Sequence, residues 1–265
     1  MSPRHRTAEA QRRQTLRLFC FNIHAGNAQS HFTEYLTRGW RHILPDSGKH
    51  KNLSGLAKLL ADFDIAALQE VDGGSLRSGF LNQASYLAEA AAFPYWWQQR
   101  NRRIGRVAES SNCLLSRVAP QSVEDHALPG RVPGRGAMLA VYGEGEEELA
   151  VVISHLSLGS GARQRQFDFI GDLIAPFRHA VVMGDFNCQP TSPGFRRFLD
   201  DTGLRVPGAA ALPTYPAWKP QRSIDHILLS ESLQALRYEV PDIRLSDHLP
   251  IVVDVALPDR LRLRG

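Results

Sequence analysis

Short apolar runs, separated by turn residues, recur along most of the chain. Eight of them are rich in β-branched residues and have the length of buried strands. They lie at residues 16–23, 64–70, 112–116, 137–142, 148–155, 179–184, 224–229 and 251–256. We predict a β-strand at each of these positions.

Helical periodicity appears between several of the predicted strands, at residues 53–63, 82–92, 162–177 and 193–203. In the third of these segments, Phe167, Ile170 and Ile174 recur at spacings of three and four and would share one face of a helix. Alternation of strands and helices indicates an α/β fold, and the strands are numerous enough for two packed sheets.

Two segments are predicted to be loops. Residues 27–51 are longer than a usual connection between a strand and a helix, and residues 72–80 are rich in glycine. Long connections at strand ends often carry the elements that choose a substrate. The apolar residues of the first loop would meet a substrate or pack on the body; they are Phe32, Tyr35, Trp40 and Ile43.

The length and composition suit one globular domain. A chain of 265 residues with 43% hydrophobic and 22% charged residues can bury a sizeable core. We predict a single domain over residues 16–258, between a flexible basic tail at 1–15 and a short tail at 259–265. The segment from Trp96 to Arg106 combines tryptophans with arginines, so it is either a nucleic-acid patch or a half-buried strand edge.

Charge and cysteine content narrow the function only a little. The net charge is +4 and most basic residues are arginine, whose planar donors suit phosphate, although a high-GC genome produces the same bias. The three cysteines form no CxxC pair, which favours a reducing compartment and argues against a thiolate zinc site. With no secretory signal or membrane-length apolar run in the sequence, we expect a cytoplasmic monomer without an obligate protein partner.

Polar residues stand at the ends of many predicted strands. One such ending, GDFN at 184–187, could be only a turn, because Asp and Asn hydrogen-bond their own backbone. Comparable endings recur at Asn22-Ile23-His24, Gln69-Glu70, Ser154-His155, Asp225-His226 and Ser246-Asp247-His248. Since ligands of open α/β sheets bind outside the strand ends, the recurrence predicts one shared site.

The charges of this site indicate its chemistry. If Glu70, Asp185, Asp225 and Asp247 share one pocket, their negative charges repel and need a cation. Oxygen ligands without thiolates suit Mg²⁺ or Mn²⁺ better than zinc. The histidines of the site would then remain available for proton transfer or contact with an oxyanion.

Seven short motifs occur in an order that resembles a known family. They are NIH at 22–24, LQE at 68–70, NCLLS at 112–116, SHL at 154–156, GDFN at 184–187, IDHI at 224–227 and SDH at 246–248. The set resembles the endonuclease/exonuclease/phosphatase family from about Leu16 to Val255. The resemblance implies a four-layer α/β sandwich, with two packed mixed β-sheets flanked by helices. It also implies a divalent-metal-dependent phosphoesterase that uses Mg²⁺ (or Mn²⁺).

The resemblance also implies a role for each matched residue. Metal ligands would be Glu70, Asn22 and Asp247. The catalytic residues would be His155, Asp185, Asn187, Asp225 and His248. Within that group Asp185 and Asn187 would orient water, while Asp225 and His248 would form a dyad that handles the proton. The substrate phosphate would meet Asn112, Arg163 and His24, and Arg163 begins an R-x-x-Q spacing with Gln166.

The motif around Glu70 departs from the pattern of abasic-site endonucleases. It reads LQEVD, as in bacterial LQEV-type members, which moves the chain away from DNA repair. We therefore expect a phosphodiesterase acting on a nucleic acid, a phospholipid head group or a small diester. A phosphomonoesterase of the same family and a catalytically inert binding module are the alternatives, and the second would require lost site residues.

Overall fold

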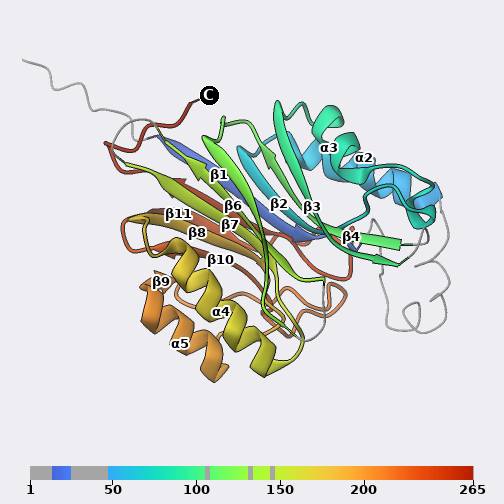
Figure 1. The fold of residues 1–265 in the computed structure, drawn as a ribbon. Coiled ribbons are helices and arrows are strands. Elements are labelled where there is room, and N and C mark those ends of the chain that lie inside the picture. The colour runs from blue at the N-terminus through green and yellow to red at the C-terminus, as the bar shows by residue number, and fades with distance from the viewer. Residues whose placement is uncertain (1–13, 25–46, 105–107, 131–133, 144–146, 265) are drawn as a thin grey trace, which may run out of the picture.

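Two six-stranded sheets pack face to face in the computed structural model, which describes residues 14–24, 47–104, 108–130, 134–143 and 147–264 (Figure 1). The first sheet runs β11 (Gln234–Glu239), β12 (Ile251–Ala256), β1 (Thr15–Asn22), β2 (Ile65–Val71), β4 (Ala108–Ser116) and β3 (Tyr95–Ile104). The second runs β5 (Ser122–Ala127), β6 (Gly136–Tyr142), β7 (Leu149–His155), β8 (His179–Asp185), β10 (Asp225–Ser230) and β9 (Leu204–Arg205).

Both sheets are mixed. The pairs β1–β2 and β7–β8 are parallel, whereas the other neighbouring strands, such as β8–β10 and β1–β12, pair antiparallel. The carboxyl ends of β1, β2, β7 and β8 therefore lie where β10 begins and where the chain enters β12. This arrangement gathers the polar strand endings at one end of the sandwich.

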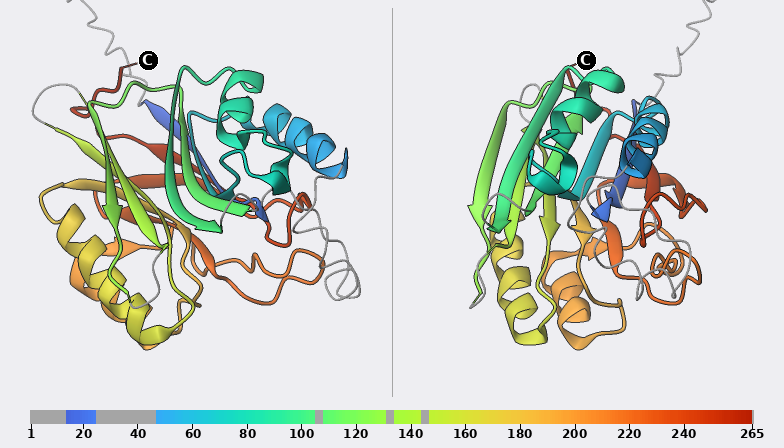
Figure 2. Two further views of the ribbon diagram at one scale, coloured as in Figure 1. Left: turned by 45° about the vertical axis from the view of Figure 1, so that its right-hand side comes forward. Right: turned by 90° about the vertical axis from the view of Figure 1, so that its right-hand side faces the viewer.

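Helices cover the outer face of each sheet (Figure 2). Against the first sheet lie α2 (Ser47–Leu60) and α3 (Gln83–Ala90), with the short 3-10 helix η3 (Leu76–Ser78) before α3. Against the second lie α4 (Ser160–Ile174) and α5 (Pro193–Thr202). Phe167 and Ile170 of α4 are buried in that outer core, as their spacing predicts. The four layers confirm the predicted α/β sandwich.

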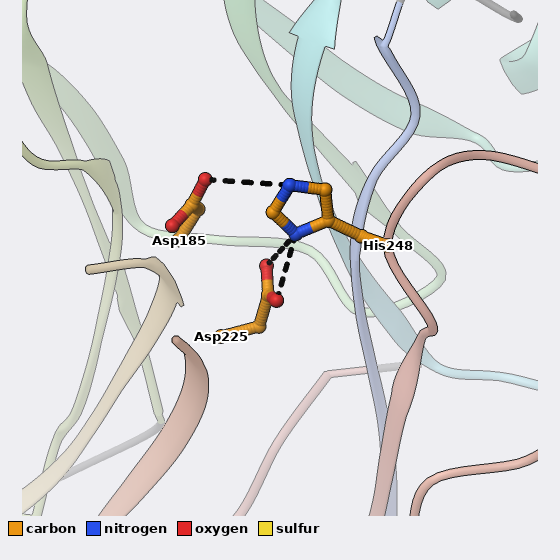
Figure 3. Close-up of side chains that lie close together, drawn as sticks. All are labelled: Asp185, Asp225 and His248. Atoms are coloured by element: carbon orange, nitrogen blue, oxygen red, sulfur yellow. Dashed lines mark hydrogen bonds and ion pairs between the residues drawn. The ribbon is translucent and has the colours of Figure 1, made fainter. Parts of the chain in front are cut away.

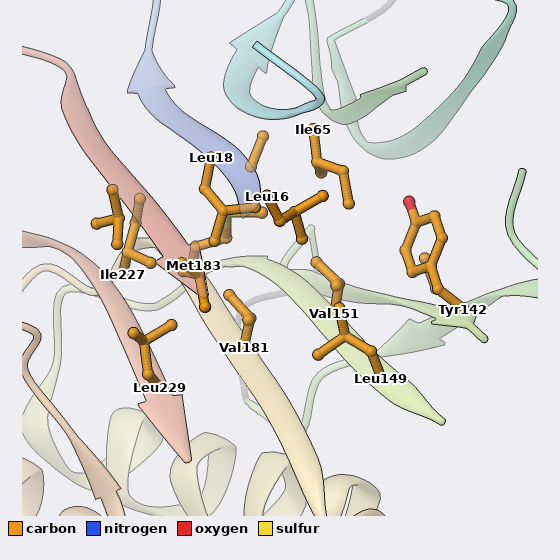
Figure 4. Packing of buried hydrophobic residues seen from close by; sticks show 14 of the residues in the cluster. Leu16, Leu18, Ile65, Tyr142, Leu149, Val151, Val181, Met183, Ile227 and Leu229 are labelled. Carbon is orange, nitrogen blue, oxygen red and sulfur yellow. The ribbon is translucent and has the colours of Figure 1, made fainter. Parts of the chain in front are cut away.

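The core between the sheets leads directly into the polar strand endings. Alternate residues of each strand point inward, and on β1 these are Leu16, Leu18 and Cys20 (Figure 4). The same inward rows contain Val151 and Ile153 on β7, Val181 and Met183 on β8, and Ile227 and Leu229 on β10. Two residues further along the chain, these rows reach Asn22 on β1, His155 on β7 and Asp185 on β8. On β10, Asp225 stands two residues before Ile227. One alternation therefore both fills the interior and directs the polar side chains toward a common point.

The predicted strands and helices are all present, and four strands were not predicted: β3, β5, β9 and β11. The predicted loop at 27–51 is partly wrong, because Ser47 already begins α2; its apolar residues lie outside the described part of the chain. On β3, Trp97 packs against the inner core while Trp96 is 39% exposed, as in a half-buried edge strand.

Residues beyond the predicted domain limit at 258 also pack on the body. Leu261 is buried, and the carbonyl of Arg264 accepts a hydrogen bond from the backbone of Ala119 at 3.0 Å. The domain limits themselves remain a prediction. Among the described helices, none has both the length and the hydropathy needed to cross a membrane.

Candidate active site

Asp185 lies at the centre of the gathered residues because it ends the central strand β8. Its partner in the parallel ladder is His155 of β7, and its partner in the antiparallel ladder is Asp225 of β10. The preceding Gly184 has φ +150°, and a Cβ there would collide with the carbonyl of Ser154. Glycine thus lets β7 and β8 approach closely at the position where their two polar side chains emerge.

Asp225 and His248 form a buried pair. The His248 Nδ1 lies 2.8 Å from Asp225 Oδ2 and 3.0 Å from Oδ1, while its Nε2 faces Asp185 Oδ2 at 4.0 Å (Figure 3). Burial opposes a charge on the ring, but Asp225, Asp185 and Asp247 outweigh it and raise the pKa of His248 to about 10. The geometry is that of the predicted dyad, with the carboxylate fixing one ring nitrogen.

His155 and Asp185 form a second close contact, with Nε2 and Oδ2 separated by 3.4 Å. Burial lowers the pKa of His155 in spite of the neighbouring carboxylate. Burial and the nearby Asp225 together raise the pKa of Asp185. Asp185 therefore lies between two histidines and an aspartate, where small changes in charge shift its proton affinity.

Asn22 joins Glu70 to Asp185. Its Nδ2 donates to Asp185 Oδ2 at 3.1 Å and to Glu70 Oε1 at 3.4 Å, while its Oδ1 accepts from the backbone of His24 at 3.1 Å. Burial opposes a charge on Glu70, but His24 and His155 lower its pKa. Two carboxylates from different sheets thus share one amide donor.

His24 is paired with Asp247, which differs from the predicted contact of this histidine with substrate phosphate. The His24 Nδ1 lies 2.9 Å from Asp247 Oδ1, and Ser246 Oγ donates to the same oxygen at 3.1 Å. Burial opposes both charges, yet the pair raises the pKa of His24 and lowers that of Asp247. The predicted contact of His24 with substrate phosphate remains a prediction.

The backbone of Asn187 adopts a left-handed conformation. The residue has φ 53°, its N–H donates to Asp185 Oδ1 at 2.9 Å, and its Nδ2 donates to the carbonyl of Leu156 at 2.9 Å. The side chain is therefore anchored to the segment that follows His155. This contact places Asn187 beside Asp185, as the GDFN motif predicts.

Arg163 and Gln166 hold the loop that follows His155. Arg163 donates to the carbonyls of Ser157, at 3.1 Å, and Leu158. Gln166 accepts from the Ser157 backbone at 2.9 Å and donates to its hydroxyl at 2.9 Å. The R-x-x-Q spacing thus supports the loop beside the site, and the predicted contact of Arg163 with phosphate remains a prediction.

Asn112 is bonded to two neighbouring strands. It is fully buried, and its Nδ2 donates to Gln99 Oε1 at 3.1 Å and to the Gly136 carbonyl at 3.0 Å. Its Oδ1 has no hydrogen-bond partner within the described residues. This amide therefore connects β4 with β6, and the predicted contact of Asn112 with substrate phosphate remains a prediction.

The donor set fits a hard divalent cation. By distance alone, ligand atoms of Asp185, Asp225 and His248 lie within 4.8 Å of one another. The Asp225 carboxylate, however, is already engaged by the His248 ring, so this group resembles a proton dyad more than a complete metal site. The carboxylates of Glu70 and Asp185 meet at the Asn22 amide nitrogen, where both sheets end, and carboxylate oxygens suit Mg²⁺ or Mn²⁺.

Thr214 is the contact of this site that sequence reasoning missed. Its Oγ1 donates to Asp225 Oδ2 at 2.5 Å from a loop without secondary-structure periodicity. A threonine between Pro213 and Tyr215 carries no signal that would link it to a residue eleven positions later.

Comparison with known proteins agrees with these motifs. Residues 21–248 match the Endonuclease/Exonuclease/phosphatase family. The chain belongs to this family. No curated protein matches the sequence. The bacterial LQEV-type subgroup stays a prediction.

Solved structures of similar fold come from several bacteria. The fold resembles that of an endonuclease/exonuclease/phosphatase from Beutenbergia cavernae, with a TM-score of 0.74, 20% identity, and coverage of 94% of this chain and 73% of that one. A mannosyl-6-phosphatase from Bacteroides thetaiotaomicron has a TM-score of 0.68 and 18% identity, and the match covers 91% of this chain and 99% of that one. Sphingomyelinase C from Streptomyces griseocarneus has a TM-score of 0.64 and 16% identity, and the match covers 91% of this chain and 99% of that one. At such identities these likenesses concern the fold.

Proposed function

We propose that the chain is a divalent-metal-dependent phosphodiesterase that hydrolyses a phosphate ester by in-line attack of water. The observation that carries the proposal is the convergence of Asp185, Asp225, His155 and His248 at one end of the interior, beside Glu70 and Asn22. Carboxylates for a cation and histidines for protons and oxyanions are the groups that this reaction needs.

Metal binding would fall to Glu70, Asn22 and Asp247, with Asn22 bonded to Asp185. Bound Mg²⁺ or Mn²⁺ would polarise a phosphoryl oxygen and neutralise the charge that develops during attack. The ionised state of Glu70, favoured by His24 and His155, suits this role. Two other residues, His155 and Asn187, would offer preorganised donors to the phosphate, a function typically worth about 10²–10³ in rate per donor.

Proton transfer would fall to Asp185 and the dyad. Asp185 faces His155 and His248 and accepts from Asn187, so its carboxylate would orient the attacking water. Asp185 would accept a proton from the water as its oxygen bonds to phosphorus. His248, whose pKa lies near 10, would carry a proton at neutral pH and donate it to the leaving oxygen as the bond from that oxygen to phosphorus breaks. Asp225 would keep the ring in one orientation, and such acid–base help contributes roughly 10²–10⁴ in rate.

The substrate would be a phosphodiester of a nucleic acid or a phospholipid head group. The proteins of similar fold include a mannosyl-6-phosphatase as well as a sphingomyelinase C, so a phosphomonoesterase is the second candidate. A catalytically inert binding module would have lost metal or dyad residues. This alternative is disfavoured because Glu70, Asp185, Asn187, Asp225 and His248 are all present, and each bonds to another residue of the candidate site. A monomeric state and a cytoplasmic location stay predictions.

The proposal is tested with purified protein, a panel of substrates and a chelator. We expect EDTA to abolish hydrolysis of bis-p-nitrophenyl phosphate and Mg²⁺ or Mn²⁺ to restore it. Comparison with p-nitrophenyl phosphate, DNA, RNA and phospholipid vesicles would then choose the substrate class. Asp185→Asn should be inactive, whereas Asp201→Asn, an exposed aspartate paired with Arg197 on α5, should match the parent. Full activity in EDTA, or in the Asp185→Asn variant, would refute the proposal.

A further inference from the structure

Thr214 has a fully buried side chain whose hydroxyl contacts the dyad carboxylate. Its Oγ1 donates to Asp225 Oδ2 at 2.5 Å, the shortest kind of hydrogen bond expected between a hydroxyl and a carboxylate. The same hydroxyl lies 3.4 Å from the backbone N–H of Asp225 and 3.5 Å from that of Ile224. It can therefore accept from this backbone while it donates to the side chain.

This hydroxyl restricts the rotation of the Asp225 carboxylate. Asp225 Oδ2 receives Thr214 on one side and His248 Nδ1, at 2.8 Å, on the other. If the hydroxyl were removed, the His248 ring would still bond to that carboxylate. A terminal carboxyl torsion is intrinsically broad, so two donors from different directions define it better than one.

The backbone around Thr214 also holds the other half of the dyad. The Thr214 carbonyl accepts from Leu249, next to His248, at 2.8 Å, and the Thr214 N–H donates to Arg222 at 2.9 Å. The adjacent Tyr215 ring lies 4.9 Å from the His248 ring. One short segment therefore contacts Asp225 through a side chain and the neighbourhood of His248 through its backbone and a ring.

We propose that Thr214 is a positioning residue of the active site, whose hydroxyl orients Asp225 and, through it, the ring of His248. This inference rests on the proposed function, in which Asp225 and His248 act as the proton-handling dyad. A competing role is purely structural: Thr214 would tie the loop before β10 to the chain before β12 and would have no effect on the chemical step.

Isosteric and conservative variants separate these two roles. We expect Thr214→Val to lower kcat for bis-p-nitrophenyl phosphate with Mg²⁺ by about 10- to 100-fold, with little change in KM. Thr214→Ser keeps the hydroxyl and should stay within about threefold of the parent. The matched control is Thr202→Val, which removes a hydroxyl bonded to the Phe198 carbonyl at 2.6 Å on α5 and should leave kcat unchanged. Rates are compared below the melting temperature of each variant.

A double-mutant cycle shows whether Thr214 acts through Asp225. Once Asp225→Asn has removed the carboxylate, adding Thr214→Val should cost almost nothing further in kcat. An equal loss in both backgrounds, or a Thr214→Ser variant as slow as Thr214→Val, would overturn the positioning role while leaving the dyad intact. If Asp225→Asn itself retained full kcat, the proposed dyad would be wrong, and the role of Thr214 would be wrong with it.

Discussion

Three residues of the candidate site adopt backbone conformations that L-amino acids rarely use. His24, Glu70 and Asn187 have φ values of 43°, 56° and 53°. Each follows or ends a strand that leads into the site, namely β1, β2 and β8. Such conformations cost on the order of 1–3 kcal/mol each and persist where the surroundings impose them. Here the left-handed conformation accompanies the side-chain contacts of His24 with Asp247 and of Glu70 with Asn22. At Asn187 it accompanies the bond from the backbone N–H to Asp185.

His226 supports the site from behind without contacting its oxygens. The residue is buried between Phe186 and Phe195, with ring centroids 5.3 and 4.7 Å away, and its Nε2 lies 3.0 Å from the carbonyl of Cys188. Burial lowers its pKa to about 4 from an ordinary value of 6.5. The native ring is therefore neutral at pH 6, where the unfolded chain already begins to bind the proton.

The stability of the protein should consequently fall on acidification through this residue. Above pH 6.5 His226 is neutral in both the folded and the unfolded protein, and its neutral burial does not reduce the free energy of unfolding. Between pH 6.5 and about 4 the unfolded chain binds the proton while the folded protein does not, so the free energy of unfolding falls. The predicted loss amounts to about 3 kcal/mol. In urea unfolding at a series of pH values, His226→Gln should lose less stability than the parent over this interval. Parallel curves for the two proteins would contradict a buried neutral ring.

At the level of elements, the four strands that the sequence did not predict are the four sheet edges. β3 and β11 flank the first sheet, and β5 and β9 flank the second. Both β5 and β11 alternate exposed with half-buried residues, so neither contains the continuous apolar run that identifies a strand buried on both faces. Interior strands were predictable because each must fill a core on both sides.

The candidate site was predictable where a residue continues an interior strand. Asn22, His155 and Asp185 each follow buried inward-facing residues at a spacing of two, and Asp225 precedes such residues at the same spacing, so their convergence follows from strand pairing. The pairing of His24 with Asp247 was not predictable, because it depends on how two irregular segments cross. Thr214 was missed for the same reason, since its loop has no periodicity to place it.

Close approach of β7 and β8 is the element-scale feature on which this convergence depends. Gly184 has φ +150°, and an added Cβ would collide with the Ser154 backbone. We expect Gly184→Ala to destabilise the fold by at least about 2 kcal/mol and to separate His155 from Asp185, lowering kcat even in the folded fraction. Denaturant unfolding and steady-state kinetics check both effects.

A control glycine on α4 distinguishes this steric effect from a general cost of substitution. A Cβ at Gly161 would meet nothing within 4 Å. Gly161→Ala should therefore match or slightly exceed the parent in stability, because alanine favours a helix over glycine by up to about 1 kcal/mol. If Gly184→Ala were as stable and active as Gly161→Ala, the close approach would have no part in forming the site.

For the whole molecule, the site joins two sheets that pack through a large apolar core and a few polar contacts, such as the bond from Asn112 to the Gly136 carbonyl. Glu70 ends β2 of the first sheet, Asp185 ends β8 of the second, and Asn22 bonds to both side chains. A cation bound between these carboxylates would add a polar link at the end of the interior. Metal binding should therefore stabilise the packing of one sheet on the other, as well as activate the site.

Thermal melts with and without Mg²⁺ test this link. A ligand that binds only the native state at about 100 times its Kd contributes about 2.7 kcal/mol, which corresponds to roughly 5–10 °C in a domain of this size. Glu70→Gln keeps an oxygen that can accept from Asn22, so its metal-free melting temperature should stay close to that of the parent. Its shift with Mg²⁺ should be much smaller, and its activity should be lost. A parent protein that melts at the same temperature with saturating Mg²⁺, Mn²⁺ or EDTA would show that no cation joins the two sheets.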